Sequence, residues 1–186
     1  MISEKLQIDS TWCLFLDRDG VINKKLNEDY VKNYDEFEFI GGNLESLAKL
    51  SLIFNKIVIV TNQQGVGKGL MKLDELIDIH NKMLEDITKN NGRIDYIYYC
   101  TATKDEESFF RKPNVGMALR AKKDFPDINF KKSVIVGDSI SDMQFGRRMR
   151  MTTVFITNDL SRIAINPYLI DYAYPDLFSF TNDIIY

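Results

Sequence analysis

Short apolar runs alternate along this chain with segments of helical periodicity, and this alternation limits the possible folds more than any other feature. The first run, residues 12–16, is too short and too uniformly apolar for a helix, which is typical of a strand buried on both faces of a parallel sheet. We expect further strands at residues 57–60, 94–99, 134–136, 153–156 and 172–174. Helices are expected to begin near Asn43, Leu73 and Asn114 and beyond Asp142, with a short one at the C-terminal end. The pattern predicts an α/β fold, a Rossmann-like doubly wound parallel sheet of about five to six strands with helices on both faces.

Length and composition limit the kind of protein. The 186 residues contain no repeat, low-complexity tract or linker, so we expect residues 1–186 to form a single domain and to act as a monomer. The 27 acidic and 24 basic side chains give a net charge of −3, which does not favour nucleic acid as a partner. No apolar run approaches the roughly 20 residues that span a bilayer, and Met1 to Thr11 is polar. We therefore expect a cytoplasmic protein without a membrane partner, and the two cysteines predict no disulfide framework.

Two aspartates, Asp17 and Asp19, follow the first predicted strand and are separated by one arginine. The carboxyl end of a strand is where open α/β sheets bind ligands. Two carboxylates this close repel each other, and a half-buried pair is costly to keep ionised without a cation. Oxygen ligands favour Mg²⁺, and Gly20 lets the backbone turn so that both carboxylates face the same space. An ordinary acidic turn explains these residues equally well when they are taken alone.

Polar side chains also follow the other predicted strands. Thr61 and Asn62 come after the second, Lys112 lies in the loop after the third, and Asp138 follows the fourth. Parallel strands end at one edge of the sheet, so we expect these side chains to meet. They suit phosphoryl transfer, because a carboxylate can attack phosphorus while a metal, a cation and hydrogen-bond donors stabilise the equatorial oxygens. Asp142, one helical turn beyond Asp138, is expected to support the metal site.

The order Asp-x-Asp-Gly-Val, Val-Thr-Asn, Arg-Lys-Pro and Gly-Asp-x-x-x-Asp resembles the four motifs of the haloacid dehalogenase superfamily of aspartyl-phosphate phosphatases. The chain is still more similar to the branch that contains D-glycero-D-manno-heptose-1,7-bisphosphate phosphatase and histidinol phosphatase, through residues 16–23, 61–63, 98–100 and 111–113. The resemblance covers residues 12–157. It implies a fold without a large cap domain, because no large insertion follows the first or second motif, and hence an open site.

The resemblance also implies a role for each carboxylate. Asp17 would be the nucleophile, and Asp19 would protonate the leaving oxygen and then deprotonate the water that breaks the aspartyl phosphate. Asp17, the main-chain carbonyl of Asp19 and Asp138 would hold Mg²⁺. Asp142 would support these ligands without binding the metal itself.

The remaining motif residues would bind a small phosphorylated metabolite. Thr61, Asn62 and Lys112 would bind the phosphate, and Arg111 would orient the substrate. A guanidinium binds phosphate in bidentate fashion, which favours a sugar bisphosphate such as heptose 1,7-bisphosphate over histidinol phosphate, whose amine would meet Arg111 unfavourably. A phosphotransferase would share the chemistry but need an acceptor site shielded from water. A non-catalytic binding protein would be expected to have lost an essential side chain, and none is missing here.

One segment departs from the family pattern. Many relatives carry a zinc loop of the form Cys-x-His, several residues, then Cys-x-Cys before the Arg-Lys-Pro motif. Here Cys100 is followed by Ala102, Ser108 and Phe110 at those positions. One cysteine cannot build a tetrahedral zinc site. We therefore predict no structural zinc, and expect Phe109 and Phe110 to pack inward and order the loop.

Two other features have ordinary explanations. Residues 65–69 resemble a P-loop, but Asn62 stands where its first glycine belongs and Gly69 replaces the Ser or Thr after the lysine. We predict a mobile loop near the substrate, with Lys68 as a second phosphate contact. His80 is the only histidine and lies on an apolar helix face, which favours packing over catalysis.

Overall fold

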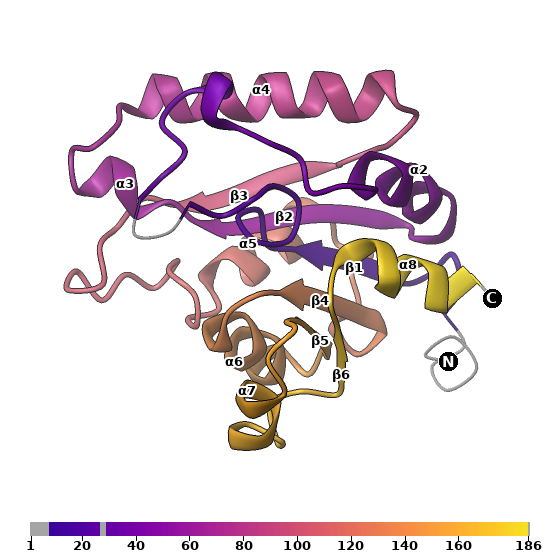
Figure 1. The fold of residues 1–186 in the computed structure, drawn as a ribbon. Helices are drawn as coiled ribbons and strands as arrows, with labels where there is room; N and C mark the ends of the chain where they lie inside the picture. Colours follow the sequence, from indigo (N-terminus) through magenta and orange to yellow (C-terminus); the bar gives the residue numbers. More distant parts are fainter. Residues whose placement is uncertain (1–7, 27–28, 186) are drawn as a thin grey trace.

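The computed structural model describes residues 8–26 and 29–185, which form a six-stranded sheet in the order β3-β2-β1-β4-β5-β6 (Figure 1). The strands are β1 (Cys13–Leu16), β2 (Lys56–Asn62), β3 (Tyr96–Cys100), β4 (Ser133–Gly137), β5 (Thr152–Ile156) and β6 (Tyr172–Tyr174). Every neighbouring pair is parallel. The predicted doubly wound sheet is confirmed, with strand boundaries that differ from the expected ones by at most two residues.

The helices connect these strands. They are α2 (Asn43–Ile53), α3 (Gln64–Gly67), α4 (Leu73–Lys89), α5 (Gly116–Asp124), α6 (Ile140–Met149), α7 (Leu160–Ile165) and α8 (Leu177–Ile185), with 3₁₀ turns η1 (Tyr34–Glu36) and η2 (Phe130–Lys132). The prediction of a mobile loop after β2 is wrong, because α3 forms a helical turn there. Gly65 lets the Tyr30 ring pack closely on this turn, since a Cβ at that position would lie 3.0 Å from the ring.

Two apolar layers hold the helices on opposite faces of the sheet. Leu14 and Leu16 of β1 belong to the core that α2, α4 and α8 cover, whereas Cys13 and Phe15 belong to the core that α5 and α6 cover. Alternate residues of a strand point to opposite faces, so β1 is buried on both sides. In Figure 1, α4 runs along the top of the view beyond β3, and α6 lies in the lower part beside β4 and β5, which it contacts.

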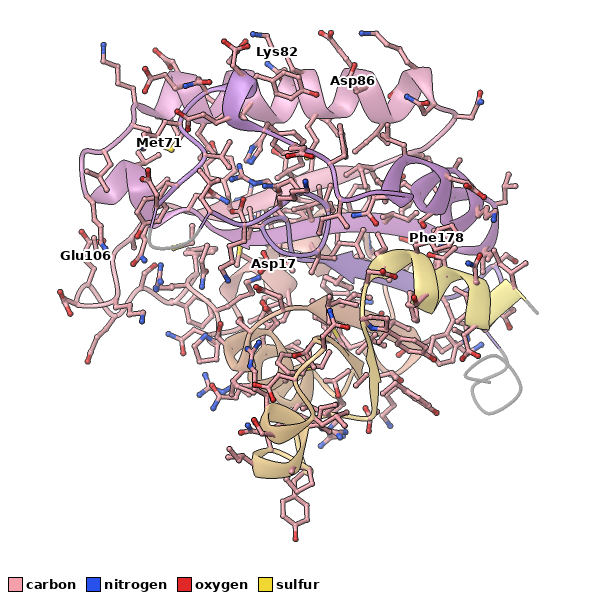
Figure 2. All side chains as sticks on the ribbon, viewed as in Figure 1. Asp17, Met71, Lys82, Asp86, Glu106 and Phe178 are labelled. Carbon is pink, nitrogen blue, oxygen red and sulfur yellow. The ribbon has the colours of Figure 1, made fainter. Side chains whose placement is uncertain are left out.

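The C-terminal residues, which lie beyond the sequence motifs, complete this architecture. β6 adds the last strand, and α8 packs against α2. Phe178 of α8, labelled in Figure 2, lies against the start of α2, where a Cβ on Gly42 would approach its ring to 2.8 Å. The described residues contain no large cap domain, and none of their helices has the length and apolarity needed to cross a membrane.

The order of the strands determines where the sheet forms a ligand-binding crevice. β1 lies between β2 and β4, so the chain builds β1, β2 and β3 on one side before it crosses to β4 on the other. This crossing is the topological switch point, where open α/β sheets bind ligands beyond the strands' carboxyl ends. The irregular segment after β1 lies beside this point, where Lys25 and Tyr30 line a cavity. It is anchored to α4 by the Tyr34 hydroxyl, which donates to Asp86 Oδ2 at 2.6 Å.

Candidate active site

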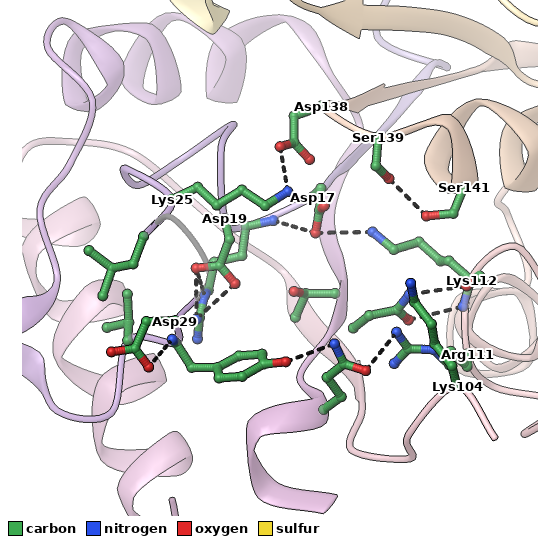
Figure 3. Close-up of a pocket in the computed structure, with 17 residues that line it drawn as sticks. Asp17, Asp19, Lys25, Asp29, Lys104, Arg111, Lys112, Asp138, Ser139 and Ser141 are labelled. Atoms are coloured by element: carbon green, nitrogen blue, oxygen red, sulfur yellow. Dashed lines mark hydrogen bonds and ion pairs between the residues drawn. The ribbon is translucent and has the colours of Figure 1, made fainter. Parts of the chain in front are cut away.

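A cavity of about 280 Å³ opens at the carboxyl ends of β1, β2 and β4 (Figure 3). The structure brings to its wall all but two of the site residues predicted from the sequence: Asp17, Asp19, Thr61, Asn62, Arg111, Lys112 and Asp138. The exceptions are Asp142, which is fully buried behind the wall, and Lys68, which does not line the cavity. These side chains meet because the parallel strands end at the same edge of the sheet.

Asp17 is the last residue before the chain turns away from β1, and its carboxylate is held at one oxygen. Oδ1 accepts a hydrogen bond from the Arg18 amide at 2.8 Å and an ion pair from Lys112 Nζ at 3.0 Å. Burial and then the charge of Asp142 raise the pKa of Asp17 to about 6, although Lys112 opposes the rise. No described residue donates to Oδ2, which keeps its lone pairs for another partner.

Lys112 is a buried cation whose ammonium group lies close to three oxygen atoms. Nζ lies 3.0 Å from Asp17 Oδ1, 2.5 Å from Asp142 Oδ1 and 2.6 Å from the carbonyl of Val60. Burial would lower its pKa, but the charges of Asp142 and Asp17 outweigh burial and raise it. As the site stands, Lys112 holds the Asp17 carboxylate and offers no spare donor to a phosphate.

Asn62 fixes the main chain of Lys112. Its Oδ1 accepts from the Lys112 amide at 3.0 Å, and its Nδ2 donates to the Lys112 carbonyl at 3.1 Å. The side chain predicted to bind phosphate is therefore used to join the end of β2 to the Arg-Lys-Pro loop. Thr61 Oγ1 accepts from Gln63 Nε2 at 2.8 Å, so its hydroxyl hydrogen remains available to a ligand in the cavity.

Asp19 accepts hydrogen bonds from three side chains. Arg18 donates to both carboxylate oxygens at 2.9 and 3.0 Å, Asn23 Nδ2 donates at 2.9 Å and Gln63 Nε2 at 2.8 Å. Burial alone would raise the pKa of Asp19, but the Arg18 charge and these hydrogen bonds lower it below its ordinary value. Asp19 is thus ionised at neutral pH in the arrangement seen here.

Asp138 and Asp142 differ in what their oxygens contact. Both oxygens of Asp142 are taken, Oδ1 by Lys112 and Oδ2 by the Ser139 amide and hydroxyl at the start of α6. Asp138 Oδ2 pairs with Lys25 Nζ at 2.7 Å, whereas its buried Oδ1 has no hydrogen-bond partner among the described residues. Burial, followed by the charge of Asp17, raises the pKa of Asp138.

These contacts decide which groups could hold a metal. One carboxylate oxygen each from Asp17, Asp138 and Asp142 lie within 4.8 Å of one another. Asp142 Oδ1 is in an ion pair with Lys112 and its Oδ2 accepts from Ser139, whereas Asp138 Oδ1 has neither kind of partner among the described residues. The better ligands are therefore Asp17, Asp138 Oδ1 and the main-chain carbonyl of Asp19, which accepts no backbone hydrogen bond in the described chain. A set made only of oxygens suits Mg²⁺.

Arg111 reaches the cavity from the loop after β3. Its Nη1 donates to the Ala102 carbonyl at 2.8 Å and its Nη2 to Gln64 Oε1 at 3.3 Å. Gln64 in turn donates from Nε2 to the Tyr30 hydroxyl at 2.8 Å. The hydrogen bonds therefore link α3, the segment after β1 and the loop of Arg111 across the cavity mouth, as the dashed lines in Figure 3 show.

The expectation that two phenylalanines order this loop from within is wrong. Phe109 is 55% exposed and Phe110 is 46% exposed, and their rings contact each other edge-on at 5.7 Å. Polar contacts hold the loop instead, since Asn114 Nδ2 donates to the Ser108 carbonyl at 3.0 Å in addition to the Arg111 bonds. The main chain of Phe109 packs closely on Gly116, where a Cβ would lie 2.7 Å from its carbonyl oxygen.

Several contributors were not predicted from the sequence. Gln63 directly follows the Thr-Asn motif and bridges Asp19 to Thr61, so its position in the motif was a usable signal. Lys25 comes from an irregular segment without periodicity, and nothing in the sequence indicates that it reaches Asp138. Lys68 does not line the cavity as predicted, because its Nζ lies 3.1 Å from the Tyr30 hydroxyl.

A switch-point crevice in which a buried lysine holds a carboxylate beside a second carboxylate defines the haloacid dehalogenase class of phosphatases. More narrowly, the chain belongs to the polynucleotide kinase 3 phosphatase family, whose model matches residues 14–174. The resemblance stated from the motifs is confirmed.

Individual relatives narrow the comparison further. The chain is 39% identical over 138 residues to D-glycero-alpha-D-manno-heptose-1,7-bisphosphate 7-phosphatase of Mycobacterium bovis, covering 74% of this chain and 73% of that protein. It is also 39% identical over 150 residues to the Campylobacter jejuni protein of the same name, covering 80% and 84%. The crystal structure of D,D-heptose 1,7-bisphosphate phosphatase from B. bronchiseptica, complexed with magnesium and phosphate, matches with a TM-score of 0.84 at 27% identity, over 94% of this chain and 98% of that one.

Proposed function

We propose that this enzyme is a Mg²⁺-dependent phosphatase that removes one phosphate from a heptose 1,7-bisphosphate through an aspartyl phosphate formed on Asp17. The observation that carries the proposal is the fixed geometry of Asp17, whose Oδ1 is held by Lys112 and the Arg18 amide while Oδ2 is left free. A carboxylate held at one oxygen presents the other as a nucleophile in a defined direction.

In the first step, Asp17 Oδ2 attacks phosphorus and the bond from phosphorus to the sugar oxygen breaks. Lys112 keeps Asp17 ionised, and bound Mg²⁺ would offset the charge of the phosphate oxygens and the two ligand carboxylates. The leaving oxygen takes a proton from Asp19. Asp19 is ionised in the arrangement described above, and the negative charge of a bound phosphate ester raises its pKa toward the protonated form this step requires.

In the second step, Asp19 takes a proton from the water that attacks the phosphorus of the aspartyl phosphate. The bond between phosphorus and Asp17 breaks, which releases inorganic phosphate, restores the Asp17 carboxylate and returns Asp19 to its protonated form. The Arg18, Asn23 and Gln63 hydrogen bonds favour the ionised Asp19 that accepts this proton.

The substrate assignment is supported by the cations around the cavity and by the names of the relatives. Lys104 and Arg111, from the loop after β3, line the cavity together with the carboxylates, so a ligand with a second anionic end meets positive charge on the side of that loop. The relatives at 39% identity are named for heptose bisphosphate. Histidinol phosphate is the second candidate, and its amine would approach these same cations.

A substrate panel tests the assignment. We expect release of phosphate with Mg²⁺ to be fastest from a heptose 1,7-bisphosphate, of which both anomers are assayed, and slower from histidinol phosphate, phenyl phosphate and an oligonucleotide with a 3′-phosphate. Faster turnover of histidinol phosphate or of the oligonucleotide would overturn the substrate assignment while leaving the phosphatase mechanism intact.

Replacement of the nucleophile tests the mechanism itself. Asp17→Asn keeps the shape of the side chain and removes its charge, so we expect turnover of every ester in the panel to be abolished. A near-normal rate in purified Asp17→Asn protein would show that the aspartyl phosphate is not formed. Thermal unfolding of the variant, measured beside the wild type, controls for misfolding.

We extend the proposal to the assembly of the enzyme and to zinc. Residues 1–186 form one domain that acts as a monomer in the cytoplasm, supported by the packing of α8 on α2 and by two free, buried cysteines, which suit a reducing compartment. The loop after β3 works without zinc, supported by Ala102, Ser108 and Phe110 in place of ligands. One zinc ion per purified chain, or a dimer in light scattering, would contradict the respective statement.

A further inference from the structure

A second buried cation, Arg18, lies beneath the cavity beside Asp19. Its side chain is only 1% exposed, and its guanidinium donates to Asp19 through Nε at 3.3 Å and through Nη2 at 2.9 and 3.0 Å. A guanidinium stays charged in proteins and carries five donors in a rigid plane, so the donors that Asp19 does not use require another acceptor.

His80 supplies that acceptor. Its Nε2 lies 3.2 Å from Arg18 Nη1. Burial, followed by the charge of Arg18, lowers the pKa of His80 to about 3, so the ring is neutral at physiological pH. Because Nε2 faces a donor that cannot lose its proton, Nε2 accepts and the ring proton lies on Nδ1. His80 is 5% exposed and does not line the cavity, so it can act on the reaction only through Arg18.

The helix that carries His80 is firmly placed. α4 buries Leu76, Ile79 and Met83 on the face that also carries His80, in the core over β1 and β2. The ring of His80 also contacts Tyr99 of β3, with the ring centres 5.6 Å apart. The packing of α4 therefore fixes the position of His80 Nε2. This acceptor in turn fixes the plane of the Arg18 guanidinium, whose long side chain has many rotamers of its own.

We propose that His80 is a positioning residue that orients Asp19 through Arg18. The neutral ring holds the guanidinium in the plane that grips both oxygens of Asp19, so the carboxyl group keeps the direction needed to exchange protons with the leaving oxygen and with water. This inference rests on the proposed function, in which Asp19 is the acid and base. The competing explanation is that His80 only fills space between α4 and the sheet.

Leaving-group dependence separates positioning from packing. Phenyl phosphate needs a proton on its leaving oxygen, whereas 4-nitrophenyl phosphate needs little. In single-turnover hydrolysis we expect His80→Leu to lose about tenfold in rate with phenyl phosphate and under about twofold with the nitrophenyl ester. The tenfold loss is smaller than the loss expected when acid catalysis is removed altogether, because Asp19 is still present. His80→Gln, whose Oε1 can accept from Arg18, should restore most of the loss.

A matched control and a double-mutant cycle complete the test. Met83→Ala opens a cavity on the same helix face and removes no hydrogen bond of Arg18, so it should slow both esters equally if at all. In the Asp19→Asn background, His80→Leu should have no further effect on phenyl phosphate, because the group that it positions is gone. Equal losses for both esters in His80→Leu, without rescue by His80→Gln, would overturn the inference. If the Asp17→Asn variant instead kept the activity of the wild type, the proposed function would be overturned, and the inference with it.

Discussion

At the scale of single residues, the site is built from charges that share one small buried volume. Asp17, Asp138 and Asp142 are three carboxylates, and Lys112 is the buried cation between two of them. Removing one partner of such a cluster leaves a buried charge without compensation, which is costly. The polar side chains in this volume are therefore held tightly, and small changes in the space between them have large effects.

Gly20 is the position where this is most easily tested. Its φ of 87° lies in the left-handed region, and a Cβ built there would overlap the carboxylate of Asp138. We expect Gly20→Ala to displace Asp138, to weaken Mg²⁺ activation at least about tenfold, and to cost about 1–3 kcal/mol in free energy of unfolding through backbone strain. Titration of activity with Mg²⁺ measures the first effect and urea unfolding the second.

Gly69 provides the control for Gly20. It also has a positive φ, 68°, but a Cβ there would meet nothing within 4 Å. Gly69→Ala should share the cost of backbone strain and leave Mg²⁺ activation unchanged. If both variants weakened Mg²⁺ activation alike, contact between residue 20 and Asp138 would not be the cause.

At the scale of elements, strand ends were predictable and loop contacts were not. Asp17, Thr61 and Asp138 could be placed together from the sequence because parallel strands must end at one edge. The paths of the segments after β1 and β3 carry no such constraint. Two adjacent phenylalanines suggested burial by their apolarity, yet a polar network held the loop and left both rings exposed. Short helices such as α3 also lack the two turns that make periodicity visible.

The Tyr30–Gln64–Arg111 hydrogen bonds give a prediction at this scale. Gln64→Ala removes the acceptor of Arg111 Nη2 and the donor to Tyr30, so three segments lose their common link. We expect KM for a heptose bisphosphate to rise roughly threefold to tenfold, because one charge-assisted hydrogen bond positions Arg111. KM for phenyl phosphate, which has no second anionic end, should stay within about twofold.

Tyr30→Phe serves as the graded companion of that variant. It removes only the hydroxyl that Gln64 and Lys68 contact, and leaves the Gln64 to Arg111 bond in place. A smaller rise in KM for the bisphosphate is expected. A rise that was equal for both substrates in Gln64→Ala would show that Gln64 supports the loop as a whole and does not position Arg111 for a second anion.

At the scale of the whole molecule, the proposed metal site joins the two halves of the sheet, because Asp17 follows β1 and Asp138 follows β4. A ligand that binds only the folded chain stabilises it, by about 2.7 kcal/mol at a hundred times its Kd. For a chain of this size that is a rise in Tm of roughly 5–10 °C. Asp138→Asn should abolish this rise while the protein still unfolds cooperatively.

The size of this Mg²⁺-dependent rise should itself depend on pH. The pKa of Asp17 is raised to about 6, so below pH 6 the carboxyl is protonated in the folded apoenzyme and must release its proton to bind the metal. Affinity for Mg²⁺ therefore falls as pH falls, by up to about tenfold per pH unit for that one proton. Without metal the sign is opposite, because the folded chain binds a proton near pH 6 that the unfolded carboxyl, with a pKa of about 3.9, does not. Tm measured with and without Mg²⁺ at each pH isolates the metal, since groups such as His80 contribute equally to both curves. A rise in Tm that was the same at pH 5 and pH 7.5 would show that metal binding does not compete with protonation of Asp17.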